Sequence, residues 1–126
     1  MAKIWYYNYR KRKEKNVMSE KDLTELKNKM QLIFTQEMVD RINFKKGNEL
    51  RIDLHGLSVE QAKKSINNLI ALTPKHTRIE VIHGYNHGTC IKEMIRNKER
   101  FNNKRVTKLE SVNHNPGATI LEIKER

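Results

Sequence analysis

Asp53 and His55 have the residue types and the spacing for acid–base chemistry. In residues 49–55 every second side chain is apolar, namely Leu50, Ile52 and Leu54. This period of two predicts a strand, and it puts Asp53 and His55 next to each other on the same face. A carboxylate beside an imidazole selects its tautomer and stabilises its charged form, so the pair is a candidate general acid or base.

A further histidine, His83, ends a second stretch of the same kind. Residues 78–83 alternate and predict a second strand, and both predicted strands run into a His-Gly sequence. Between them, Ser58 and Gln61 match a capping box at the start of a helical stretch. Two strands joined through a helix are expected to be parallel. Asp53, His55 and His83 should therefore meet at the carboxyl edge of a sheet, where open α/β folds bind ligands.

The loop after His83 has the parts of a phosphate cradle. It consists of Gly84, Tyr85, Asn86, His87, Gly88 and Thr89, and a helix with Ile91, Met94 and Ile95 on one face follows it. Glycines let a backbone approach a ligand closely, and a helix N-terminus presents unpaired N–H groups to an anion. The same pattern also serves as an ordinary strand-to-helix turn, so both interpretations stay open.

The remaining elements complete an α/β domain. Residues 106–112 and 118–123 predict two more strands, separated by a turn at 113–117 that contains Pro116 and Gly117. The expected fold class is α/β, a two-layer sandwich of order βαβαββ with a mixed four-stranded sheet. An N-terminal helix precedes it.

That helix is expected over residues 19–44. Ser19 can cap it, and its apolar stripe is Leu23, Leu26, Met30, Ile33, Phe34, Met38 and Ile42. The stripe can pack on the domain or form an oligomer with a second copy. Residues 45–48 resemble a turn or linker. The expected division is therefore a basic and aromatic tail at 1–18, a helix and linker at 19–46, and the α/β domain at 47–126.

The charge favours polyanionic partners. Lys and Arg number 26 against 15 Asp and Glu, which gives a net charge of +11. An excess of this size suits nucleic acid, the ribosome or an anionic surface. In the tail, four aromatic residues precede the basic run Arg10, Lys11, Arg12 and Lys13, and such a combination binds nucleic acid by stacking and by phosphate contacts. A solvated tail is the alternative.

Other classes are disfavoured. The single cysteine, Cys90, excludes an internal disulfide, and no apolar run has the length of a signal peptide or a membrane span. We expect a cytoplasmic protein with no membrane partner. His55, His83 and His87 lack a cysteine partner at zinc spacing, so no metal ligand is assigned. No cofactor is required, and a divalent metal stays open.

Three segments resemble the small MutS-related (Smr) domain family. Asp53-Leu54-His55-Gly56 resembles its opening Asp-x-His-Gly motif, and the segment from His83 to Gly88 resembles its His-Gly-x-Gly-x-Gly motif. Gly117-Ala118-Thr119-Ile120-Leu121-Glu122 is similar to the closing Gly-Ala-Thr strand of the family. The resemblance covers about residues 49–124, with Asn86 in place of the usual middle glycine.

The resemblance implies nucleic-acid binding and, in several members, endonuclease activity on DNA or on messenger RNA at ribosomes. It ties Asp53, His55, His83 and Gly84 to cleavage. Two hypotheses follow. The first is an endonuclease, RNA ahead of DNA, that uses either two histidines without metal or a metal-activated water. The second is a non-catalytic module that binds RNA, DNA or the ribosome.

Overall fold

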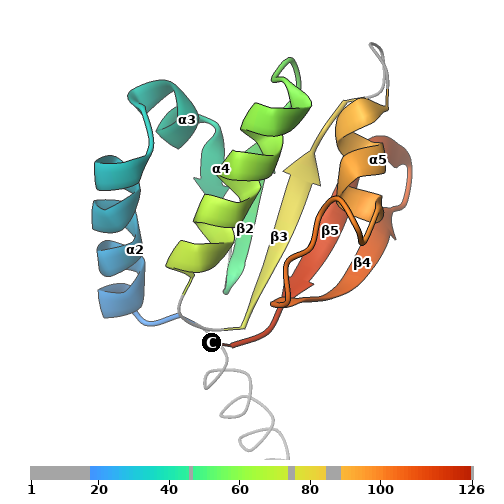
Figure 1. The fold of residues 1–126 in the computed structure, drawn as a ribbon. Coiled ribbons are helices and arrows are strands. Elements are labelled where there is room, and N and C mark those ends of the chain that lie inside the picture. The colour runs from blue at the N-terminus through green and yellow to red at the C-terminus, as the bar shows by residue number, and fades with distance from the viewer. Residues whose placement is uncertain (1–17, 46, 74–75, 85–88, 126) are drawn as a thin grey trace, which may run out of the picture.

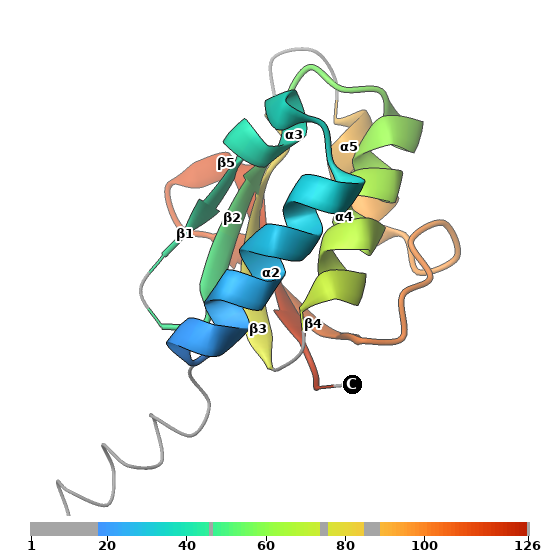
Figure 2. The same cartoon turned by 90° about the vertical axis from the view of Figure 1, so that its left-hand side faces the viewer.

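A five-stranded mixed sheet with helices on one face forms the described part of the chain. The computed structural model describes residues 18–45, 47–73, 76–84 and 89–125 (Figure 1). The strand order is β1-β2-β3-β5-β4, and Figure 2 shows the sheet and the helices as two layers. The strands are β1 (Ile42–Phe44), β2 (Glu49–Asp53), β3 (Thr77–Ile82), β4 (Val106–Val112) and β5 (Asn115–Ile123). The helices are α2 (Glu20–Ile33), α3 (Gln36–Asp40), α4 (Val59–Leu72) and α5 (Cys90–Arg96).

The predicted pair of parallel strands is confirmed. β2 pairs with β3 in parallel, with Leu50 opposite Ile79 and Ile52 opposite Val81. Both strands alternate as expected, because their apolar side chains are buried under the helices. Ser58 caps α4 through the predicted capping box, in which its hydroxyl accepts from the Gln61 N–H and the Gln61 side chain accepts from the Ser58 N–H.

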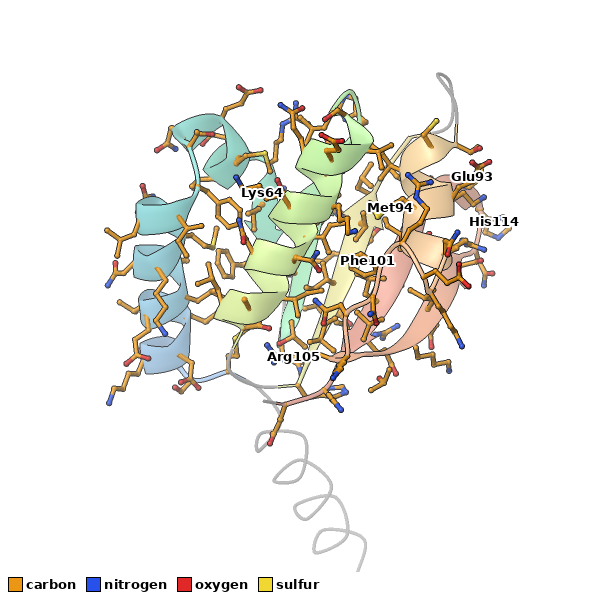
Figure 3. All side chains as sticks on the ribbon, viewed as in Figure 1. Lys64, Glu93, Met94, Phe101, Arg105 and His114 are labelled. Carbon is orange, nitrogen blue, oxygen red and sulfur yellow. The ribbon has the colours of Figure 1, made fainter. Side chains whose placement is uncertain are left out.

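The core lies between the sheet and the helices. α4 contributes Ala62, Ile66, Leu69 and Ile70, all nearly inaccessible to solvent. α5 contributes Ile91, Met94 and Ile95, and Phe101 from the following segment closes this end of the core (Figure 3). None of the described helices is both long and apolar enough to cross a membrane.

The single helix expected over residues 19–44 is wrong. α2 ends at Ile33, and Phe34 is already extended (φ −97°, ψ 150°). Thr35 then caps a new helix, α3, by accepting from the Met38 N–H at 3.3 Å. Ile42 is in strand β1, antiparallel to β2, where it pairs with Ile52. The competing helix cap at Thr35 and the open edge of β2 thus override a stripe that continues with helical spacing.

The sheet consequently has five strands, where four were expected. β1 and β2 form a hairpin closed by the Lys45 N–H to Glu49 carbonyl bond (2.9 Å), with Gly47 at φ +74°. Leu26 and Met30 of α2 are buried in the same core cluster as the strands. The segment 19–46 therefore supplies a strand and a helix to the same sheet and core as the residues after it.

The turn between β4 and β5 is tighter than the sequence predicts. β4 ends at Val112 and β5 begins at Asn115, so the turn consists of Asn113 and His114. His114 takes the left-handed conformation (φ 65°), and the register between β4 and β5 shifts at Ser111 and Val112, next to the turn. Pro116 and Gly117, expected in the turn, belong to β5.

Candidate functional site

The carboxyl ends of β2 and β3 lie side by side at one edge of the sheet. β2 ends at Asp53 and β3 at Ile82, and these two residues are partners in the parallel register. The Leu54 N–H continues the pairing by donating to the Ile82 carbonyl at 2.7 Å. The structure thus brings the Asp53–His55 segment next to His83 and Gly84.

Asp53 and His55 are in direct contact. His55 Nδ1 lies 2.5 Å from Asp53 Oδ1, and the His55 backbone N–H donates to the same oxygen at 3.1 Å. Because an ionised carboxylate only accepts, Nδ1 carries the proton and Nε2 keeps its lone pair in the neutral ring. The His55 side chain is 65% exposed. The arrangement presents a basic nitrogen of fixed tautomer to solvent.

Arg41 holds the backbone that carries this pair. Its Nη1 donates to the carbonyl oxygens of Asp53 (3.1 Å) and His55 (3.0 Å). Its own carbonyl accepts from the Asp53 N–H at 2.9 Å. Sequence reasoning missed Arg41, because it lies in the segment predicted to be helix and no motif contains it.

His83 is buried and has a partner on each ring nitrogen. Nδ1 lies 3.0 Å from the Gly84 carbonyl oxygen, and Nε2 lies 3.0 Å from the Thr119 hydroxyl. Because a carbonyl can only accept, Nδ1 donates to Gly84 and the neutral Nε2 accepts from Thr119. His83 therefore holds the start of the loop to β5, and neither nitrogen faces a ligand. Thr119 belongs to the closing Gly-Ala-Thr motif, and the sequence alone indicates no role for it.

The environment of His83 disfavours its charged form. Burial lowers the pKa of His83 below the ordinary histidine value, since a buried imidazolium loses its hydration. The hydrogen bond to the Gly84 carbonyl acts in the opposite direction, and the charges of Lys92 and Arg96 lower the pKa further. The lowered pKa of His83 agrees with the neutral tautomer that the hydrogen bonds to Gly84 and Thr119 require.

Gly84 packs against His55. It has φ +76°, and a Cβ at this position would lie 3.4 Å from the Cβ of His55. Its N–H donates to the Gly117 carbonyl at 3.1 Å. The positive φ favours glycine here, and a side chain added at this position would contact His55.

Most of the predicted phosphate cradle and the basic run lie outside the described residues. These positions are Tyr85, Asn86, His87, Gly88, Arg10, Lys11, Arg12 and Lys13. Thr89 is described, at the N-terminus of α5. Its side chain makes no capping bond, and its hydroxyl donates instead to Glu93 at 2.7 Å.

The acidic, histidine and cysteine side chains of the described residues form no metal-binding cluster. No group of three or more of them is placed to hold a metal ion in this part of the chain. Asp53 and His55 form a pair, and His83 is engaged with Gly84 and Thr119.

Comparisons with known proteins give a similarity to a solved structure. No protein-family model matches the chain, and no curated protein matches it. Among solved structures, the Smr domain of Thermus thermophilus MutS2 aligns with 59% of this chain and 96% of that domain. The identity is 23% and the TM-score 0.44.

Proposed function

We propose that this chain is a nucleic-acid endonuclease, with RNA as the favoured substrate, and that Asp53 and His55 carry the reaction. The observation that supports this most directly is the pair itself. His55 offers a basic Nε2 to solvent while a carboxylate at 2.5 Å fixes its tautomer and stabilises the imidazolium formed on protonation. The resemblance of three motifs to the Smr family supports the same assignment.

The substrate class rests on charge. A net charge of +11 attracts polyanions, and phosphate contacts supply most of the sequence-independent affinity of such proteins for nucleic acid. A histidine base acting on RNA has an internal nucleophile within reach, the ribose 2′-hydroxyl.

In the proposed reaction, His55 Nε2 removes the proton of the 2′-hydroxyl and the resulting oxygen attacks the adjacent phosphorus. The bond to the 5′ oxygen breaks and a water molecule protonates that oxygen. The hydroxide formed takes the proton back from His55, and a 2′,3′-cyclic phosphate remains. Asp53 stabilises the positive charge on His55. His83 has both ring nitrogens engaged and acts by positioning Gly84 beside His55.

The test uses RNA with a single 2′-deoxy sugar at the scissile position, in the presence of EDTA. Unmodified RNA should be cut to a cyclic phosphate, and the 2′-deoxy RNA should resist. A second reaction contains divalent metal in place of EDTA. Efficient cleavage of the 2′-deoxy substrate, or of DNA, in that reaction alone would favour a metal-activated water.

His55→Ala tests the residue. The variant should lose cleavage and melt within a few degrees of wild type, because the side chain is exposed. His114→Asn is the matched control, since it removes an exposed histidine from the β4–β5 turn and asparagine tolerates the left-handed conformation there. A drop in melting temperature of more than about ten degrees, well over 1 kcal/mol for a domain of this size, would make His55 structural.

A non-catalytic module that binds nucleic acid or the ribosome is the second candidate. It is favoured by the engagement of both ring nitrogens of His83, which leaves a single exposed histidine among the described residues of this edge. RNA that is bound and never cut, with or without divalent metal, would select this candidate.

A further inference from the structure

The face of the sheet opposite the helices has its charges paired. Glu80 accepts from Lys45 (2.7 Å) and from Arg51 (3.1 Å). Burial raises the pKa of Glu80, but these two hydrogen bonds and the two positive charges outweigh it, so the pKa lies below the ordinary value. The other pairs are Arg78 with Glu49, Glu110 and Glu122, and Lys108 with Glu110. The described part of this face therefore offers little net charge to an anion.

The surface beside α5 has more basic than acidic side chains. Residues 89–105 carry six basic and two acidic side chains. A shallow hollow of about 520 Å³ lies on this surface, and its lining is Thr89, Lys92, Glu93, Arg96 and Asn97. Glu93 is on the outer side of α5 in Figure 3. The hollow thus combines a concave shape with an excess of positive charge.

Two cations in the hollow, Lys92 and Arg96, have no ion-pair partner in the part of the chain that the structure describes. Lys92 and Arg96 are one helical turn apart, a spacing at which like charges destabilise a helix. Among the described residues neither has an acidic partner: Arg96 donates to the Ser111 hydroxyl at 2.9 Å, and the nearby Glu93 accepts from Thr89. The Arg96–Ser111 bond holds the guanidinium between α5 and β4. An anion bound here would relieve the repulsion between the two charges.

The hollow adjoins the candidate site. Arg96 donates to Ser111 of β4, Ser111 is the register partner of Thr119 on β5, and Thr119 bonds to His83. His83 bonds to Gly84, and Gly84 packs against His55. The β4–β5 pair therefore connects Arg96 to His83, and Gly84 connects His83 to the exposed histidine.

We propose that the α5 hollow is a phosphate-binding subsite, in which Lys92 and Arg96 hold the backbone of a single nucleic-acid strand next to the linkage presented to His55. This inference rests on the proposed function, because it places one nucleic-acid strand on both the α5 hollow and the Asp53–His55 pair. It assigns the positioning of substrate to α5 and the chemistry to the end of β2.

The test measures binding of fluorescent single-stranded RNA across a series of salt concentrations, in a His55→Ala background that cannot cut. Lys92→Gln/Arg96→Gln should flatten the slope of log affinity against log salt by about 1.4, because each phosphate that is no longer neutralised accounts for about 0.7. Lys21→Gln/Lys29→Gln on α2 is the matched control, because it removes the same charge from two exposed positions. Its slope should stay within error of the parent.

Arg96→Lys separates charge from packing. It keeps the positive charge while the bond to Ser111 changes, so the salt slope should be retained. An equal change in slope for the α5 and α2 double variants, or no change in either, would overturn the subsite.

The outcome is independent of the catalytic assignment. If wild-type protein fails to cut RNA while the α5 double variant flattens the slope, the subsite holds and the endonuclease proposal fails. If RNA is cut and the α5 variant changes neither the slope nor the KM, the endonuclease proposal holds and the subsite fails. Where the subsite and the endonuclease proposal are both supported, the α5 variant should raise KM more than it lowers kcat. The reason is that the two cations bind the strand and take no part in proton transfer.

Discussion

The guanidinium of Arg41 is hydrogen-bonded to the backbone of His55, at 3.0 Å from Nη1 to the carbonyl oxygen. The same nitrogen reaches the Asp53 carbonyl at 3.1 Å. The turn that carries the candidate catalytic pair is thus held by a residue between α3 and β1, outside the three motifs. The N-terminal segment therefore contributes to the geometry of the site as well as to the sheet.

Replacing Arg41 with glutamine should lower both stability and catalysis. The loss of two charged hydrogen bonds to carbonyls is expected to cost on the order of 1–3 kcal/mol in the free energy of unfolding, measured by urea denaturation. Cleavage should show a fall in kcat with little change in KM, since the ring of His55 loses its fixed backbone and the binding surface remains. Lys21→Gln, which removes an exposed charge from α2, should change neither. An Arg41 variant with normal kcat would limit this residue to a stabilising role.

Gly84 and Gly47 form a matched pair for the close approach to His55. Both have positive φ, at +76° and +74°, but only Gly84 has a neighbour, the His55 Cβ, within 4 Å of the position of a Cβ. Alanine at either position should cost about 1–2 kcal/mol through the left-handed backbone, measured by denaturation. Only Gly84→Ala should also reduce cleavage. Equal activity in the two variants would show that the approach of the loop to His55 is without consequence.

His83 should make the protein less stable in mild acid. Its pKa is lowered in the folded state by burial and by Lys92 and Arg96, so between that value and about 6.5 the unfolded chain binds more protons. The free energy of unfolding should therefore be highest above about pH 6.5 and fall as the pH is lowered through that window. Urea denaturation at about pH 7.5 and about pH 5.5 measures the difference.

Two variants test whether His83 causes this pH dependence of stability. His83→Gln removes the titrating group and should show a smaller loss on acidification, although it is less stable at neutral pH because its two bonds change. His114→Asn should keep the wild-type dependence. A wild-type loss that His83→Gln leaves unaltered would place its origin in other groups.

The N-terminal tail should add affinity without specificity. Deleting residues 1–16 removes a net charge of +5 and should weaken binding to all RNA sequences alike, because a basic segment meets mainly phosphates. The salt slope should flatten by up to about 0.7 for each phosphate that the tail no longer neutralises. A variant with glutamine at Arg10, Lys11, Arg12 and Lys13 keeps the aromatic residues and separates stacking from charge. Unchanged affinity and slope in both would assign the tail to another partner.

Local patterns determined much of the fold. The alternation in β2 and β3, the capping box at Ser58 and the helical crossover between the strands are signals within a few neighbouring residues. Because these signals agree with one another, they predicted a parallel pair ending in Asp53 and His83 at the same edge. The contact between Asp53 and His55 is also local, because the turn after β2 brings the His55 N–H onto the Asp53 carboxylate.

Other features depended on partners far away in the chain. Ile42 continues the helical stripe of α2 and also suits a strand, and only its pairing with Ile52 selects the strand. The burial of His83 and its bond to Thr119 depend on β5, which lies 36 residues further on. Arg41 reaches His55 because β1 pairs with β2. Residue types and periods within a segment determined where strands and helices can form, whereas the tertiary structure decided which histidine is exposed and which is buried, because burial depends on what packs against a side chain.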